Sequence, residues 1–273
     1  MNRRDLIDAL KAEDFSPYYR LADKIRFQEK GNYVDIRAIL EFSNICRRKC
    51  VYCGLNCRNQ ALHRYRMTPD EIVDTASAAA RAGYRTLVMQ SGEDPWFTPK
   101  ILGGLVKEIK KTGMAITLSC GEMPEEAYAY LRECGADRYL LKHETADPEI
   151  YSALHPDSSL QQRIACLKVL KRLGYETGSG FMIGLPGQTA ENPGRRPSPA
   201  SGDWLRYGRH GTLYSPSRHA FARAFQRQHR NHQTGCGSRP HPASQAEPSR
   251  YHFSWRSERQ WKKTMCSPAE PTW

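Results

Sequence analysis

Residues 35–55 read DIRAILEFSNICRRKCVYCGL, and this stretch decides the fold. The run 35–42 is rich in branched and aromatic apolar residues and is typical of a β-strand. Three cysteines follow it at C-x3-C-x2-C spacing: Cys46, Cys50 and Cys53. Side chains that bind ligands directly after a strand are typical of α/β proteins, which build their sites at the carboxyl ends of strands. The stretch therefore predicts an α/β fold with a metal site at its first strand.

The cysteine spacing leaves two kinds of metal site open. Three thiolates can hold three irons of a [4Fe–4S] cube and leave the fourth iron free to bind a small molecule. A closed structural zinc site needs four ligands, and Cys57 could serve as the fourth. Tyr52, beside the last cysteine, and the basic run 47–49 inside the loop favour the cluster.

Strand-like runs alternate with helical periods as far as residue 188. Strands are predicted at 35–43, 86–90, 115–119, 138–142 and 176–184, and helices at 68–82, 99–112, 124–134 and 159–173. Four crossover helices between apolar strands imply a parallel sheet, either a (β/α) barrel or a doubly wound open sheet. Polar residues end every strand, as in barrel enzymes, whereas an open sheet gathers them at one switch point. We expect an α/β TIM-type barrel that is truncated after about five strands.

Polar residues at these strand ends are candidate binding groups. Gly92 and Glu93 lie in the sequence SGED at 91–94, which suits either an ammonium ligand or a turn that caps a helix. Glu144 could accept two hydroxyls of a ribose or cap the chain at the surface. Arg163 could bind a carboxylate through its forked guanidinium, although a solvated helix face is the commoner place for an isolated arginine.

The composition excludes some classes of protein. No stretch reaches the roughly 20 apolar residues of a membrane span. The first 30 residues are charged and amphipathic, without the apolar core of a signal peptide. We therefore expect a cytoplasmic protein with reduced thiols, no membrane partner, and an N-terminal helical segment at 1–30. Packing roles are expected for three further cysteines in apolar or helical contexts, Cys120, Cys134 and Cys166.

Residues 193–273 differ in composition from the rest of the chain. They contain fourteen of the 41 Lys and Arg residues but only four of the 29 Asp and Glu residues, so they carry most of the net charge of +12. They contain no Ile or Val, and nine of the 17 prolines. Such a stretch cannot bury enough apolar surface to fold, so we expect a disordered tail. A basic arm for nucleic acid is the alternative, but no motif supports it, and no nucleic-acid partner is expected.

Several motifs between about residues 30 and 192 together resemble one enzyme family. They are EFSNIC at 41–46, CGL at 53–55, RYRMTP at 64–69, QSGEDP at 90–95, GADRYLLKHET at 135–145 and GLPGQT at 184–189. With the three cysteines, they resemble the radical S-adenosylmethionine (SAM) superfamily, and within it the HydE family of [FeFe]-hydrogenase maturases. Methylornithine synthase and biotin synthase are more distantly similar. The resemblance implies a radical SAM partial barrel at 31–192.

The resemblance also implies cofactors and the residues that hold them. The ligands of a [4Fe–4S] cluster would be Cys46, Cys50 and Cys53. The residues that bind SAM would be Gly92 and Glu93 at its amino group, Ser119 and Arg163 at its carboxylate, and Glu144 at its ribose. Lys142 stands where the family leads us to expect arginine, which binds anions through a different geometry.

The activity implied by the resemblance is cleavage of SAM to methionine and a 5′-deoxyadenosyl radical. In a HydE-like enzyme the radical would attack a small organometallic iron–cysteine species, a precursor of the hydrogenase diiron centre. The implied partners are the maturases HydG and HydF and an electron donor. An activity like that of methylornithine synthase or biotin synthase is the alternative.

A change of reading frame accounts for the composition of the tail. If one extra nucleotide lies between the codons of Asn192 and Pro193, codon degeneracy allows residues 193–219 to be re-read as LADDLLLLLETGCDMVGMGPFIPHPGM. That reading gives an apolar helix and then a strand, where a barrel needs its next helix and strand, and it resembles the family's own continuation. The tail is therefore predicted to be a frameshift product. The 273-residue chain is predicted to be poorly soluble and inactive, because its barrel lacks strands and exposes an edge.

Overall fold

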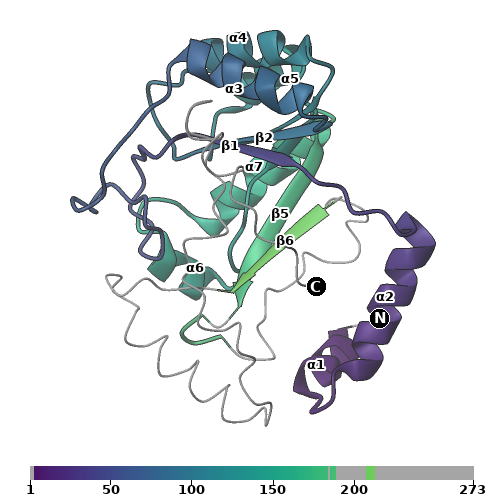
Figure 1. Ribbon diagram of the computed structural model, residues 1–273. Coiled ribbons are helices and arrows are strands. Elements are labelled where there is room, and N and C mark those ends of the chain that lie inside the picture. Colours follow the sequence, from purple (N-terminus) through teal and green to yellow (C-terminus); the bar gives the residue numbers. More distant parts are fainter. Residues whose placement is uncertain (1–2, 184, 189–206, 213–273) are drawn as a thin grey trace.

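The computed structural model describes residues 3–183, 185–188 and 207–212, and its centre is a parallel β-sheet (Figure 1). The described strands are β1 (Ala38–Ser43), β2 (Thr86–Ser91), β3 (Ala115–Ser119), β4 (Arg138–Leu140), β5 (Glu176–Ile183) and β6 (Tyr207–Thr212). The described helices are α1 (Arg3–Lys11), α2 (Ser16–Lys30), α3 (Pro69–Arg81), α4 (Pro99–Lys110), α5 (Glu125–Glu133), α6 (Pro148–Leu154) and α7 (Leu160–Arg172).

The order of the strands distinguishes a barrel from a doubly wound sheet. A doubly wound sheet reverses its strand order at a switch point. Here each strand pairs in parallel with the next one in sequence, in the order β1-β2-β3-β4-β5-β6. Right-handed crossovers that all advance the same way place their helices on one face. Contacts run along the series α3, α4, α5 and α7, and α3 packs on β1. The sheet is therefore singly wound, as in the predicted partial barrel.

The hydrophobic core lies between the sheet and this layer of helices. Leu40 and Phe42 of β1 point into it and are almost fully buried. The helices contribute residues such as Ile72 of α3 and Ile109 of α4, which are also fully buried. Burial of a side chain of this size contributes roughly 1.5–3 kcal/mol. This layer is the rigid base from which the loops at the strand ends project.

The predicted elements between residues 35 and 184 are present, with small differences at their ends. Helix α3 begins as predicted, because the side chains of Thr68 and Glu71 form a reciprocal capping box. Strand β4 ends at Leu140, two residues earlier than predicted, and β1 begins at Ala38 instead of residue 35. Helix α6 was not predicted, and it begins where the side chain of Asp147 accepts two backbone N–H groups.

Strand β6 lies in the segment 193–273, which was expected to be disordered, and it adds a sixth strand to a sheet predicted to have about five. Its backbone pairs with β5 from the Gly178–Tyr207 pair to the Ile183–Thr212 pair. The edge of β5 otherwise presents unpaired N–H and C=O groups, so an extended segment is stabilised there by main-chain hydrogen bonds, whatever its side chains. The rest of the predicted tail lies outside the described residues.

Helices α1 and α2 form the helical segment predicted for residues 1–30 and lie to one side of the sheet (Figure 1). Helix α2 has no buried residue. Exposed apolar side chains include Phe15 at its N-cap, Leu21, Ile25 and Phe27 on the helix itself, and Tyr33, Val34 and Ile36 on the segment after it. Exposed apolar surface favours association between molecules, and the low solubility predicted from the missing strands stays a prediction. Across the described ranges, no helix has the length and apolar character needed to cross a membrane.

Candidate metal and cofactor site

The three cysteines of the motif lie on the loop that follows β1. Cys46, Cys50 and Cys53 are half-buried, and all three are free thiols. The backbone N–H of Cys53 donates to the carbonyl of Cys50 (3.2 Å), which curls the chain between them. Burial, and then the neighbouring Cys53, raises the pKa of Cys50 to about 12, and burial raises the pKa of Cys53. Thiolates at these positions therefore need a positive centre to balance their charge.

Arg64 fixes the backbone on both sides of the cysteines. Its guanidinium donates to the carbonyl oxygens of Asn44 (2.6 Å), Leu55 (2.9 Å), Asn56 (2.8 Å) and Asn59 (3.3 Å). The guanidinium is a planar fork of donors, so these four contacts define one arrangement of the loop. A single side chain thus ties the end of β1 to the segment beyond the last cysteine.

The cysteine loop lies directly against the end of β2. The backbone N–H of Gly92 donates to the carbonyl of Ser43 (3.2 Å). A Cβ on Gly92 would clash with the carbonyl oxygen of Ile45 and would lie 2.7 Å from the Cβ of Cys46. Only glycine leaves room for this approach. The structure therefore places Gly92 beside the first cysteine of the motif.

Glu93 also lies beside Cys46, but protein groups occupy its carboxylate. Its backbone N–H donates to the sulfur of Cys46 (3.4 Å). One carboxylate oxygen lies 2.6 Å from Nε of Arg48 and 3.2 Å from Nε of Arg47, both on the cysteine loop. The other oxygen accepts the backbone N–H of Glu122 (2.9 Å). Its negative charge thus neutralises arginines of the loop, and a role toward an ammonium group stays a prediction.

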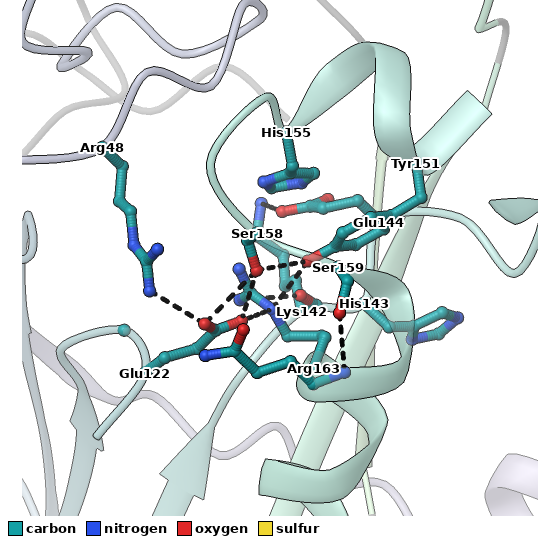
Figure 2. A network of polar contacts seen from close by, with 12 residues as sticks. Arg48, Glu122, Lys142, His143, Glu144, Tyr151, His155, Ser158, Ser159 and Arg163 are labelled. Carbon is teal, nitrogen blue, oxygen red and sulfur yellow. Dashed lines mark hydrogen bonds and ion pairs between the residues drawn. The ribbon is translucent and has the colours of Figure 1, made fainter. Parts of the chain in front are cut away.

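A buried ion network joins the cysteine loop to α7 (Figure 2). The carboxylate of Glu122 is 3% exposed and lies between two arginines. Oε2 lies 2.8 Å from Nη2 of Arg48, and Oε1 lies 2.7 Å from Nε of Arg163. The hydroxyl of Ser158 donates to the same carboxylate (3.1 Å). Sequence reasoning missed Glu122, because neither a motif nor a spacing marks it.

Arg163 is buried in the site, so the commoner interpretation of a solvated helix face is wrong. Its side chain is 9% exposed. Besides the contact with Glu122, its Nε donates to the hydroxyl of Tyr151 (3.1 Å) and its Nη1 donates to the carbonyl of Lys142 (3.2 Å). These contacts hold the guanidinium in one orientation at the rim of the sheet.

Glu144 follows β4 in a strained backbone conformation, with a φ of 62°. Its backbone is held to β5, because its N–H donates to Gly180 O (3.0 Å) and its carbonyl accepts from Met182 N (2.8 Å). Its carboxylate is 4% exposed, and Oε1 meets Tyr52 OH (3.1 Å) and Lys142 Nζ (3.3 Å). Oε2 is buried and has no hydrogen-bond partner among the described residues. Such an oxygen costs about 1–3 kcal/mol, and strained residues cluster at binding sites, so Glu144 suits a ligand that donates hydroxyl protons.

His155 lies between Cys50 and the Glu144 pocket and was also missed by sequence reasoning. Its Nδ1 is 3.3 Å from the sulfur of Cys50, and its Nε2 is 3.3 Å from the hydroxyl of Tyr52. Its ring stacks on Tyr151 with centroids 4.3 Å apart (Figure 2). Burial, and then the charge of Arg163, lowers the pKa of His155 to about 3. The ring is therefore a neutral group in this site.

The structure brings most of the predicted site residues to one edge of the sheet. Contacts link Cys46 with Gly92 and Glu93, and link Cys50 with Glu144 through His155 and Tyr52. Ser119 lies at the carboxyl end of β3, opposite Gln90 of β2. The three cysteines expected to pack do so: Cys120 and Cys134 are buried in the core, and Cys166 packs against it.

The four-cysteine zinc alternative finds no preformed site. Zinc–sulfur bonds are about 2.3 Å long, so sulfurs around a tetrahedral zinc lie roughly 3.8 Å apart. Within the described ranges, no three His, Cys, Asp or Glu side chains are grouped closely enough for one ion, and Cys57 is exposed. A [4Fe–4S] cube spaces its thiolates more widely, because each binds a different iron. The loop of three half-buried cysteines fits the cluster.

Comparisons with known proteins identify the family of this chain. Residues 40–194 match the model of the Radical SAM superfamily. The chain is 56% identical over 174 residues to the [FeFe] hydrogenase maturase subunit HydE of Thermotoga maritima, a match that covers 64% of this chain and 50% of that protein. It is 31% identical over 185 residues to 3-methylornithine synthase of Methanosarcina acetivorans, covering 67% of this chain and 53% of that protein.

Solved structures show the same fold. Methylornithine synthase (PylB) is similar with a TM-score of 0.75 and 28% identity, over 81% of this chain and 67% of that chain. A structure of HydG, a maturase of the [FeFe]-hydrogenase, has a TM-score of 0.62 and 23% identity, over 68% of this chain and 44% of that chain. This chain spans about half the length of the curated relatives it matches.

Proposed function

Because this chain belongs to the radical SAM superfamily, whose enzymes use a [4Fe–4S] cluster and SAM, we propose that Cys46, Cys50 and Cys53 hold that cluster. The observation that carries the proposal is Oε2 of Glu144, which is buried and has no hydrogen-bond partner among the described residues, while Oε1 of the same carboxylate is joined to Cys50 through Tyr52 and His155. When bound and reduced, the cluster would supply the electron that splits SAM into methionine and a 5′-deoxyadenosyl radical.

The chain's own residues would bind and orient SAM. Glu144 Oε2 would accept the hydroxyls of the ribose, which replace the donors that it lacks. Arg163, held by Glu122, would bind the carboxylate end of the methionine together with Ser119. A guanidinium that is already fixed loses little further freedom when the ligand binds.

The amino group of SAM would lie where the cysteine loop meets the end of β2. Gly92 lacks a side chain at that point, and a Cβ there would push on the backbone next to Cys46. Glu93 would contribute mainly by fixing Arg48, because its carboxylate is engaged by the loop. The side chain of Glu122 is almost fully buried, and the low dielectric constant around it strengthens each of these electrostatic contacts.

We further infer a role in assembly of the [FeFe]-hydrogenase diiron centre, with a small organometallic iron–cysteine species as substrate. The 56% identity to the HydE subunit of Thermotoga maritima supports this inference. The partners would be HydG, HydF and an electron donor, in the cytoplasm. An activity like that of methylornithine synthase is the second candidate, favoured by the TM-score of 0.75 to PylB.

The frameshift hypothesis assigns a different sequence to strand β6. The backbone forms a strand at Tyr207–Thr212, and the shifted frame reads MVGMGP at these six positions. An apolar run there would give β6 a side chain pattern that suits a barrel strand. Resequencing the gene from the codon of Gly187 onward would show whether the extra nucleotide is present, and a shifted frame full of stop codons would remove the hypothesis.

The activity test compares two proteins, both reconstituted without oxygen. One is the 273-residue chain, and the other comes from the gene after one nucleotide is deleted between the codons of Asn192 and Pro193. We expect robust formation of 5′-deoxyadenosine only by the second protein, and restored hydrogenase activity when it is added to extracts that lack HydE. Robust turnover by the 273-residue chain would contradict the frameshift account. SAM cleavage with production of methylornithine would favour the second candidate.

A further inference from the structure

The cysteine loop is clamped onto the segment that follows α6. The backbone N–H of Val51 donates to the carbonyl of Leu154 (3.0 Å), and the backbone N–H of Lys49 donates to the carboxylate of Asp157 (3.2 Å). Nη1 of Arg48 donates to the carbonyl of Asp157 (3.0 Å). The clamp fixes the distance between this segment and the middle cysteine, Cys50.

His155 is the side chain that this clamp directs at the sulfur. It is 2% exposed, and its ring is stacked on Tyr151 at an interplanar angle of 15°, so it cannot turn freely. Its two nitrogens have different partners, each at 3.3 Å: Nδ1 meets the sulfur of Cys50, and Nε2 meets the hydroxyl of Tyr52. His155 is not among the residues proposed above to bind SAM or to hold the cluster, so the proposed function gives it no role of its own.

The protons in this chain of contacts can be arranged in two ways. A neutral imidazole carries one N–H, and a tyrosine hydroxyl has one proton to donate. Tyr52 can donate to Glu144 Oε1 (3.1 Å) or to His155 Nε2 (3.3 Å). In the second case the imidazole proton lies on Nδ1 and points at Cys50.

We propose that His155 is a positioning residue that donates its Nδ1–H to the sulfur of Cys50 and thereby raises the reduction potential of the cluster. The inference rests on the cluster proposed above. Hydrogen bonds to ligand sulfurs stabilise the more negative, reduced state of an iron–sulfur cluster. A thiolate bound to iron has no proton of its own, so the histidine must be the donor in this contact.

The same contacts couple the cluster to the ribose pocket. When ligand hydroxyls donate to Oε2 of Glu144, they reduce the negative charge of the whole carboxylate and weaken the attraction of Oε1 for the hydroxyl proton of Tyr52. Its proton then turns to His155 Nε2, which fixes the imidazole proton on Nδ1, toward Cys50. Occupation of the pocket therefore favours the arrangement that makes the cluster easier to reduce.

Two substitutions separate the contacts of His155. In His155→Asn, the side chain amide can take the place of Nδ1 and still donate to sulfur, while the contact with Tyr52 is lost. In His155→Gln, the amide can reach the place of Nε2 and keep Tyr52, while the donor to sulfur is lost. His143→Gln is the matched control, because His143 is partly buried nearby but contacts Ser179 (2.8 Å) instead of a cysteine.

The experiment uses the 273-residue chain, reconstituted with iron and sulfide, and each variant is first analysed for its iron content. The reduced cluster is then counted by electron paramagnetic resonance across a redox titration. At the midpoint potential of the unsubstituted protein, we expect the ratio of reduced to oxidised cluster to fall about fivefold in His155→Gln. It should stay near the unsubstituted value in His155→Asn and in His143→Gln. With ¹⁵N-labelled histidine, pulsed measurements should detect a nitrogen coupled to the cluster that both His155 variants lose.

Equal midpoints in the two His155 variants and the unsubstituted protein would overturn the inference while leaving the proposed cluster intact. Equal shifts in His155→Asn and His155→Gln, with no coupled nitrogen in the unsubstituted protein, would also overturn it. An unsubstituted protein that takes up no iron would contradict the proposed function as well, and the iron analysis identifies that case.

Discussion

The carboxylate of Glu122 lies 2.7 Å from Nε of Arg163, and both side chains are withdrawn from solvent. The same carboxylate holds Arg48 at 2.8 Å, and Arg48 belongs to the cysteine loop. One carboxylate therefore ties the loop proposed to hold the cluster to the arginine proposed to bind the methionine end of SAM. The two halves of the site are fixed relative to one another before any ligand is present.

Replacement of Glu122 by alanine leaves two shielded arginines without their shared partner. We expect the free energy of unfolding to fall by about 3–5 kcal/mol, because breaking a buried ion pair leaves an uncompensated charge. Denaturation with urea measures the loss. Glu125→Ala is the control, because Glu125 and its partner Arg172 are largely exposed and the pair contributes roughly 0–1 kcal/mol. Equal effects of the two substitutions would contradict the network.

Glu144→Gln tests the ribose site. The amide keeps the shape of the side chain but offers one acceptor oxygen where the carboxylate offers two, so SAM binding by the reconstituted chain should weaken about 10–100-fold. Stability should change little, because Oε2 has no partner among the described residues. Equilibrium dialysis measures binding, with Glu149→Gln on the exposed face of α6 as the control. Unchanged affinity for SAM would remove Glu144 from the site.

Gly92→Ala tests the close approach of β2 to the cysteine loop. The added Cβ would push on the carbonyl of Ile45 and on Cys46, so the loop must move and uptake of iron should fall severalfold. Gly104→Ala in α4 is a matched control, since a Cβ there meets nothing within 4 Å. That change should leave iron uptake intact and stabilise the helix by about 0.5–1 kcal/mol. Normal iron uptake by Gly92→Ala would show that the contact is not needed.

The pH dependence of stability should reveal His143. Burial, and then the charge of Arg163, lowers the pKa of His143 to about 4, below its ordinary value near 6.5. The unfolded chain then binds more protons than the folded one, so stability is fully present above about pH 6.5 and is lost as the pH falls toward 4. Urea denaturation of His143→Gln should show a weaker loss across this window. His63→Gln, at an exposed histidine, should follow the unsubstituted chain. If the stability of His143→Gln also follows that of the unsubstituted chain, the pKa of His143 is not lowered in the folded protein.

Local signals in the sequence predicted most of the fold, and long-range contacts explain the rest. The capping box of Thr68 and Glu71 spans three residues and could be read directly from the sequence. The contact of Cys50 with His155 joins residues 105 positions apart, and that of Arg48 with Glu122 joins residues 74 apart. Composition and spacing carry no signal for such pairs. Taken alone, Arg163 also favoured a solvated helix face, because its partners come from other elements of the fold, and only the family resemblance predicted that it lies in the site.

Strand β6 was not predicted for a different reason. The composition of residues 193–273 predicts no stable structure, because apolar side chains are scarce there. The strand at Tyr207–Thr212 depends on the backbone edge of β5, which accepts an extended partner through main-chain hydrogen bonds. A prediction made from side chain composition alone cannot detect that a free backbone edge is available for pairing.

The most direct test of the account is metal analysis and electron paramagnetic resonance of the 273-residue chain after anaerobic reconstitution, with and without SAM. We predict about four iron atoms per chain and a spectrum of the reduced cluster that changes when SAM is added, because the fourth iron has no protein ligand. Cys50→Ala should abolish both. A chain that retains zinc, or an iron spectrum that SAM leaves unchanged, would contradict the assignment of Cys46, Cys50 and Cys53 to a SAM-binding cluster.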